Sequence, residues 1–283
     1  MFWQTSRFRI DLSTPRVMGI VNVTPDSFSD GGRHDDLAQA MRHCEKLMAD
    51  GADILDIGGE STRPGSPPVP MEEELARVLP LVKWAVSLGV PISVDTNKTA
   101  VMEAVLDAGA DIVNDILALR APGAIDVVAG HPACGICLMH MHGEPQHMQQ
   151  SPMVGNVAPQ VHAFFEARTR LLQAAGVSAD RIVLDPGIGF GKTVAQNFEL
   201  LARQRMSAPS GYPILAGWSR KSSIGAVTGL SVSQRMVPSV VAAVLAVGQG
   251  ARIVRVHDVA ETVAGLKVLN AMQEQSPHLA DDQ

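Results

Sequence analysis

The sequence predicts an α/β protein folded as a (β/α)8 TIM barrel, and three observations lead to that prediction. Eight short apolar runs are spread along the chain, amphipathic stretches lie between them, and polar residues follow almost every run. Short runs rich in Ile and Val are typical of parallel strands that are buried on both faces. Their regular alternation with helices favours a barrel, which usually needs about 250 residues. We therefore expect residues 1–283 to form one domain.

The expected strands are bordered by glycine, proline or aspartate and comprise residues 17–21, 54–57, 91–94, 112–113, 135–139, 182–184, 214–216 and 253–256. The expected helices repeat apolar residues three and four positions apart, which gives each helix one buried face. They cover residues 37–50, 72–88, 99–108, 163–174, 198–202, 238–247 and 259–272. Glycines such as Gly51 and Gly89 follow several helices, where glycine adopts the left-handed conformation at little cost. Residues before Pro15 and the polar tail 273–283 are expected to be peripheral.

Composition and charge narrow the classes of function. The formal net charge is −6 and no basic stripe is present, so nucleic acid is not an expected partner. No run of 18 or more apolar residues exists, and the first residues lack the apolar core of a signal peptide, so neither a membrane span nor secretion is expected. Cys134 and Cys137 form a C-x-x-C pair within an apolar run. We interpret them as small buried side chains of a reduced, cytoplasmic protein, not as zinc ligands.

Polar residues follow the apolar runs at the positions where strands should end. In chain order they are Asn22, Glu60, Ser61, Thr62, Arg63, Asp95, Asn114, Asp115, His140, Asp185, Ser219, Arg220, Lys221, Ser222, Arg255 and His257. In a barrel, side chains just beyond the strand ends converge on one mouth. A doubly wound open sheet, the alternative fold, would gather them in a single crevice. Because they follow nearly every strand, the closed barrel is preferred.

The types of these residues indicate the ligand. Asp95, Asn114 and Asp185 offer carboxylate and amide groups, which suit the edge of a heterocycle rich in N–H groups and ring nitrogens. Lys221 and Arg255 are cationic, together with Arg63 and His257, and suit a phosphate or carboxylate. The first two loops, 22–32 and 58–70, are long and rich in Gly, Ser and Pro, and we interpret them as lids over a bound substrate.

Eight segments resemble the motifs of the bacterial dihydropteroate synthases, in order and at the expected spacing. They are 19–32 (GIVNVTPDSFSDGG), 56–65 (DIGGESTRPG), 92–96 (ISVDT), 113–116 (VNDI), 138–141 (LMHM), 184–192 (LDPGIGFGK), 219–222 (SRKS) and 255–258 (RVHD). The resemblance covers about residues 16–272. It implies a transferase of folate biosynthesis that joins (7,8-dihydropterin-6-yl)methyl diphosphate to 4-aminobenzoate and releases diphosphate. It also implies a sulfonamide target and a homodimer formed through helices near the end of the chain.

The resemblance implies a role for each matching residue. Asp95, Asn114, Asp185 and Lys221 would hold the pterin, and Arg255 and His257 would anchor the diphosphate together with Thr62. Asn22 would bind Mg2+, the expected cofactor. Phe28, Arg63, Pro64, Phe190 and Ser222 would form the pocket for 4-aminobenzoate, and Lys221, Arg255, His257 and Asp95 would carry the catalysis. Independently of the resemblance, Ser222 is expected to open a helix, where its hydroxyl and neighbouring N–H groups suit a carboxylate.

Several interpretations stay open at this stage. Leu117, Trp218 and Asn97 depart from the residues usual in the family, which questions the shape of the pterin mouth. Asp56 can be explained as a turn residue and is left out of the expected site, whereas Asp115 is expected to be a support. His140, His142 and His147 are not expected to form a metal cluster. Two rival functions are a non-catalytic pterin-binding paralogue and a corrinoid-dependent methyltransferase on a related barrel. The second would lack the motifs at 22–29 and 219–222.

Overall fold

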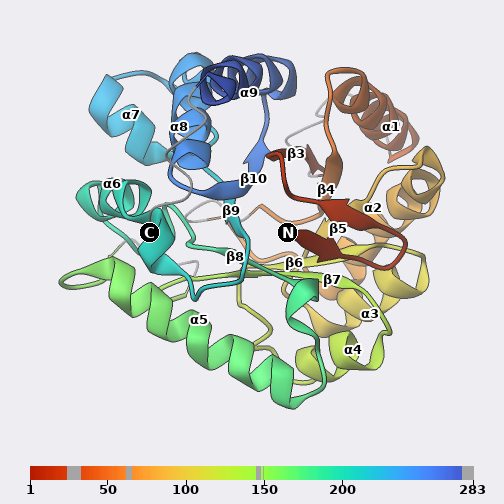
Figure 1. Ribbon diagram of the computed structural model, residues 1–283. Helices are drawn as coiled ribbons and strands as arrows, with labels where there is room; N and C mark the ends of the chain where they lie inside the picture. Colours follow the sequence, from red (N-terminus) through yellow and green to blue (C-terminus); the bar gives the residue numbers. More distant parts are fainter. Residues whose placement is uncertain (24–32, 62–65, 145–147, 149, 276–283) are drawn as a thin grey trace.

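The computed structural model describes residues 1–23, 33–61, 66–144, 148 and 150–275. Eight parallel strands close into a barrel in the order β10-β3-β4-β5-β6-β7-β8-β9 (Figure 1). They are β3 (Arg16–Asn22), β4 (Ile54–Gly58), β5 (Ile92–Asp95), β6 (Ile112–Asp115), β7 (Gly135–Met139), β8 (Ile182–Asp185), β9 (Ile214–Ala216) and β10 (Ala251–Val256). Each predicted apolar run overlaps one of these strands, so the predicted (β/α)8 barrel is confirmed and the open sheet is wrong.

The barrel closes between its last and first strands. Arg255 and Val256 of β10 lie in register with Met18 and Gly19 of β3. Residues at the two ends of the sequence therefore meet at one position of the barrel wall. We call the C-terminal ends of the eight strands the mouth and their N-terminal ends the base.

Nine α-helices of the described residues surround the strands (Figure 1). They are α1 (Arg33–Ala49), α2 (Met71–Ala85), α3 (Thr99–Asp107), α4 (Ala124–Gly130), α5 (Val157–Ala174), α6 (Val194–Ala202), α7 (Ser222–Thr228), α8 (Met236–Gly248) and α9 (Val259–Glu274). All the predicted helices are present. Helix α4 is not predicted from the sequence, because its seven residues are too few to show a helical period. Helix α6 begins four residues earlier than predicted because Thr193 and Gln196 form a capping box at its start.

The expectation that the first residues are peripheral is wrong. Strands β1 (Phe2–Gln4) and β2 (Arg9–Asp11) form an antiparallel hairpin that lies across the base of the barrel (Figure 1). Trp3, Ile10 and Leu12 pack on a layer of side chains from seven barrel strands: Met18, Ile54, Ile112, Cys137, Val183, Leu215 and Ile253. Trp3 is fully buried, and its Nε1 donates to the carbonyl oxygen of Arg181 at 2.9 Å. The hairpin therefore seals the apolar interior against water.

The cysteines behave as predicted. Cys44, Cys134 and Cys137 are buried free thiols. Burial raises the pKa of Cys137 well above its usual value, so this thiol stays protonated. Among the described residues, no helix is both long and apolar enough to cross a membrane.

Candidate active site

The structure brings the predicted strand-end residues together at the mouth. Asp95 and Asp185 are the last residues of β5 and β8, Asn114 lies near the end of β6, and Arg255 lies in β10. All three of the acidic and amide side chains are buried. Asn22 ends β3 and lies in register with Gly58 of β4. The convergence predicted from the alternating pattern is therefore present in the folded chain.

Asp56 of β4 is the centre of a buried polar network that the sequence did not reveal. Its carboxylate accepts hydrogen bonds from Arg255 Nε at 2.6 Å and Ser93 Oγ at 2.6 Å. Asn114 Nδ2 donates to both carboxylate oxygens at 3.3 Å. Asp56 is fully buried and two positions before the end of its strand, so the interpretation as a turn residue is wrong. The available signal was an aspartate inside an apolar strand, which needs a buried partner.

Arg255 joins this network to Asp95. Its Nη2 donates to Asp95 Oδ2 at 2.7 Å while Nε is bonded to Asp56. Although burial lowers the pKa of Arg255, the two carboxylates outweigh it and raise that pKa above its usual value. Burial raises the pKa of Asp95 to about 7, against the opposing effect of Arg255. One guanidinium therefore holds two buried carboxylates in place, and the carboxyl of Asp95 is poised near neutral pH.

Asp185 and Lys221 form the other side of the mouth. Asp185 Oδ1 accepts from the backbone N–H of Gly187 at 2.8 Å, and burial raises the pKa of this carboxyl. Burial lowers the pKa of Lys221 to about 8, and the charge of Asp185 opposes that shift. Lys221 Nζ lies 4.3 Å from the centre of the Phe190 ring, a cation–π contact. Phe190 thus lies directly against the predicted pterin-binding lysine.

His257 follows β10 and is oriented by Ser219, which the sequence placed at a strand end but without a role. Ser219 Oγ and His257 Nδ1 are 2.9 Å apart, and the backbone N–H of His257 donates to the same hydroxyl at 3.1 Å. Beside them, Arg220 forms an ion pair with Asp258 at 2.5 Å. Arg220 therefore fastens the loop after β9 to the start of α9, whereas His257 is bonded to Ser219 of that loop.

His140 does not belong to the mouth. Its ring packs edge-on against Phe164 of α5, with ring centres 4.9 Å apart. Its Nδ1 lies 3.0 Å from Nζ of the buried Lys192, and burial together with that ammonium lowers the pKa of His140 to about 2. Nδ1 is therefore an acceptor and the ring is neutral. The strand-end position was correctly read, but its side chain points outward into the helix layer.

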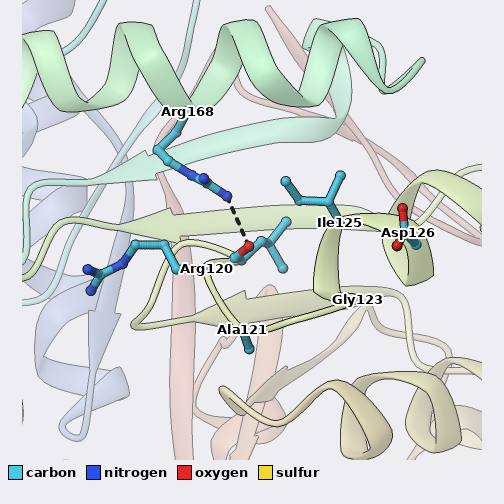
Figure 2. A pocket seen from close by; sticks show the side chains of 7 residues that line it. Arg120, Ala121, Gly123, Ile125, Asp126 and Arg168 are labelled. Atoms are coloured by element: carbon cyan, nitrogen blue, oxygen red, sulfur yellow. Dashed lines mark hydrogen bonds between the residues drawn. The ribbon is translucent and has the colours of Figure 1, made fainter.

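Asp115 supports the loop after β6, as expected. Its two oxygens accept from the backbone N–H groups of Leu117 at 2.7 Å and Leu119 at 2.6 Å. Leu119 and Ala118 have φ of 58° and 53°, values that L-residues adopt only when held. Arg168 of α5 donates to the carbonyl oxygen of Leu119 at 3.0 Å, the dashed line in Figure 2. This clamp fixes the wall next to Asn114.

A hollow of about 460 Å³ lies beside this clamp, outside the barrel. Figure 2 shows Arg168 reaching from α5 towards the loop, while the Arg120 guanidinium points away from it. The lining residues are Leu119, Arg120, Ala121, Gly123, Ile125, Asp126 and Arg168. None of the predicted site residues lines this hollow. The chemistry is therefore at the mouth, where the buried charges gather.

Two of the departures from the family pattern leave the mouth intact. Trp218 is buried and packs against Phe198 of α6, with ring centres 5.2 Å apart. Its bulk therefore fills the space behind β9. Leu117 packs on a small apolar cluster that contains Phe190, Met139, Met141, Met148 and Ile116. This cluster packs against Phe190, which also contacts Lys221.

Of the residues predicted for the 4-aminobenzoate pocket and the lids, the structure describes Ser222 and Phe190. Ser222 is the first residue of α7, as expected, and is exposed beside Lys221. Phe28, Thr62, Arg63 and Pro64 lie outside the described residues. Their assignment to the lids and to the 4-aminobenzoate pocket stays a prediction.

The chain matches known proteins over nearly its whole length. The family model described as pterin binding enzyme matches residues 18–257. The dihydropteroate synthase of Neisseria meningitidis serogroup C is 49% identical over 274 residues, which span 95% of this chain and 97% of that protein. Burkholderia cenocepacia dihydropteroate synthase complexed with 7,8-dihydropteroate superimposes with a TM-score of 0.90 at 51% identity, covering 97% of each chain. The Yersinia pestis enzyme in its sulfonamide drug complex gives a TM-score of 0.91 at 44% identity, covering 97% of this chain and 100% of that one.

The family model spans residues from β3 to His257, and both the curated relative and the solved structure cover at least 95% of the chain. The chain belongs to the pterin-binding enzyme family, among the dihydropteroate synthases.

Proposed function

We propose that the protein condenses (7,8-dihydropterin-6-yl)methyl diphosphate with 4-aminobenzoate to give 7,8-dihydropteroate and diphosphate. The observation that carries the proposal is the division of the mouth into two chemistries. Buried Asp185 on β8 and half-buried Lys221 after β9 make up the first set, and Arg255 on the adjoining β10, with His257 and its partner Ser219, makes up the second. A pterin ring needs the first set and a diphosphate needs the second. The relative solved with bound 7,8-dihydropteroate has the product of this reaction in the same fold.

The carboxylate of Asp185 would accept two hydrogen bonds, from the 2-amino group and the N3–H of the pterin. Lys221 would donate to an acceptor atom of the ring, and Asn114 and Asp95 would bind the remaining edge. Three of these groups are already fixed by bonds within the protein: Gly187 N–H to Asp185, Arg255 to Asp95, and Asn114 to Asp56. Lys221 is held by its contact with the Phe190 ring. Because they are preorganised, little ordering free energy is spent when the pterin binds.

In the proposed reaction the bond between the pterin methylene carbon and the diphosphate oxygen breaks, and its electron pair leaves with diphosphate. The amine of 4-aminobenzoate forms the new C–N bond and releases one proton. Arg255 and His257 would stabilise the negative charge that builds on the leaving oxygen. The two known ion pairs of Arg255 use Nε and Nη2, so a further N–H of its guanidinium can bind a phosphate oxygen.

We propose Mg2+ as a cofactor, with Asn22 as its protein ligand. Mg2+ keeps several waters and uses one or two protein oxygens together with substrate phosphates. The described residues contain no group of three His, Cys, Asp or Glu side chains able to hold a metal alone, so the donor set fits an ion that binds together with diphosphate. When bound, the ion would neutralise charge on the leaving group. Calorimetry of inorganic diphosphate should show Mg2+-dependent binding that Asn22→Ala loses; the same dependence in both proteins would contradict the assignment.

We also propose that two copies form a homodimer through α8 and α9. These helices pack against each other and expose Val237, Val241, Leu245, Val268 and Met272, each more than half exposed. Several large apolar side chains exposed on two neighbouring helices are typical of an interface. Sedimentation of Leu245→Glu should give monomers, whereas Leu171→Glu on α5, with a similarly exposed leucine, should leave the dimer intact. A wild-type monomer would refute the proposal.

The cytoplasm is the proposed location, because three free thiols persist where the environment is reducing. The decisive assay for the function measures diphosphate release with both substrates, and with each one alone. Release only when both are present would support the condensation. Pterin binding without any release would favour the rival function, a non-catalytic pterin-binding paralogue.

A further inference from the structure

The loop after β8, residues 186–192, lies tightly against the segment that follows β7. Gly187 and Gly191 have φ of 69° and 68°. A Cβ atom on Gly187 would lie 1.9 Å from the carbonyl oxygen of His140, and one on Gly191 would lie 2.2 Å from that of His142. The contact is therefore between two backbones and leaves no room for side chains. Phe190 stands on this loop with a left-handed glycine on each side, Gly189 and Gly191.

A buried lysine, Lys192, forms hydrogen bonds to the backbone of this loop. Lys192 Nζ donates to the carbonyl oxygens of Gly187 at 2.9 Å and Phe190 at 3.1 Å. It also contacts His140 Nδ1 at 3.0 Å and the His140 carbonyl oxygen at 3.3 Å. Burial lowers the pKa of Lys192 to about 7, which reflects how unfavourable this position is for an ammonium group. The Gly187 carbonyl oxygen also accepts from the backbone N–H of Phe190 at 3.1 Å, so Lys192 is a second donor to this turn.

A second clasp joins the same loop to the start of α7. Asn197 Oδ1 accepts from the backbone N–H of Gly189 at 2.8 Å, and Asn197 Nδ2 donates to Ser223 Oγ at 2.9 Å. Both Asn197 and Ser223 are buried. Ser223 directly follows Ser222 and lies two residues after Lys221, whose Nζ contacts the Phe190 ring. The clasp therefore spans the two walls of one subsite.

We infer that Lys192 and Asn197 are positioning residues that fix the distance between Phe190 and the Lys221–Ser222 wall and so set the width of the 4-aminobenzoate subsite. The inference rests on the proposed function, which assigns Phe190 and Ser222 to that substrate. Lys192 donates to the carbonyl oxygen of Phe190, and Asn197 accepts from the N–H of the neighbouring Gly189. Both side chains therefore add to the backbone bond from Phe190 N–H to the Gly187 carbonyl oxygen in fixing this loop. Neither residue needs to touch a substrate to act.

The test compares the effect of each variant on 4-aminobenzoate with its effect on a pterin analogue. Lys192→Met keeps the length of the side chain and removes its bonds, and Asn197→Ala opens the second clasp. Each should raise the KM for 4-aminobenzoate about tenfold or more, as expected when a binding wall shifts by a fraction of an ångström. The affinity for a pterin analogue, measured by calorimetry, should change less than about threefold, since Asp185 keeps its own bond to Gly187 N–H. Ser223→Ala removes one bond of the second clasp and should give a smaller rise in KM.

Arg181→Met is the matched control. Arg181 is also a buried cation that donates to carbonyl oxygens, those of Cys134 at 2.8 Å and Val128 at 2.6 Å, but it lies at the base. It should lower thermal stability and leave both substrates unaffected. If Lys192→Met fails to fold, Asn197→Ala and Ser223→Ala decide the question. The inference is overturned if stability falls while the KM for 4-aminobenzoate is unchanged, or if pterin affinity and that KM worsen equally. Failure of the proposed function would instead be seen in the wild type, as an absence of turnover.

Discussion

The base and the mouth of the barrel are built from the same eight strands but differ in the side chains that they bury. The base buries mainly apolar side chains, and the mouth buries charged ones. At the base, a hairpin buries Trp3 and Leu12 on an apolar layer, and the charged Asp111 is satisfied by Arg7 and by the backbone N–H of Ile92. At the mouth, Asp95 and Asp185 are buried and Lys221 is half-buried, and burial moves the pKa values of all three towards neutrality. The base therefore contributes mainly to stability. The mouth contains buried charged groups that lower stability and that a bound ligand can pair with.

The largest effect is expected from breaking the base. Trp3→Ala should lower the free energy of unfolding by about 3–5 kcal/mol, because it empties a fully buried site and leaves the Arg181 carbonyl oxygen without its donor. Chemical denaturation monitored by circular dichroism measures the loss. The KM for 4-aminobenzoate should stay unchanged below the unfolding transition. A raised KM in the folded variant would show that the two ends are not independent.

Asp185 at the mouth and Asp111 at the base are two buried carboxylates whose substitution should have different effects. Asp185→Asn should weaken binding of a pterin analogue about 100-fold or more, since the amide presents a donor where the pterin also donates, and each unpaired buried donor costs about 1–3 kcal/mol. Asp111→Asn, at the base, should reduce stability and leave pterin binding intact. Calorimetry and thermal unfolding of both variants provide the check. Near-normal pterin affinity of Asp185→Asn would contradict the assignment.

The charge of Lys221 predicts a pH dependence. Its pKa is lowered to about 8, and a lysine is charged below its pKa and neutral above it. A neutral amine donates more weakly to the pterin, so kcat/KM for the pterin substrate should fall as pH rises through about 8. Lys221→Arg should remove this fall, since arginine stays charged across the range. The fall persisting unchanged in Lys221→Arg would assign it to another group.

The smallest effect is expected at the exposed rim. Ser222→Ala should weaken 4-aminobenzoate binding about fivefold, which corresponds to one ordinary hydrogen bond of about 1 kcal/mol. Sulfonamides should compete with 4-aminobenzoate, and this variant should weaken both to a similar extent because a sulfonyl group can replace the carboxylate. Ser233→Ala, another exposed serine, is the control. Non-competitive inhibition of an active enzyme would place the drug elsewhere.

The barrel was predictable because its signals are local. Each strand is a short apolar run and each long helix has one apolar face, so periodicity alone located them. The hairpin β1–β2 was not predictable, since its three-residue strands show no period and their burial depends on side chains from seven distant strands. Helix α4 was missed for the same reason of length. The mouth residues were found because strand ends converge in any barrel.

The sequence by itself determined which chemistry the protein carries: the strand-end carboxylates, amides and cations, and the motifs that place the chain in its family. Only the tertiary structure decided how those groups are used. It showed that Asp56 orients Arg255, that His140 turns away into the helix layer, and that Lys192 holds the loop of Phe190. The physical reason is that a residue's type and strand position are local properties. The partner of a buried charge is a long-range property: Arg255 and Asp56 are 199 residues apart in the chain and 2.6 Å apart in the fold.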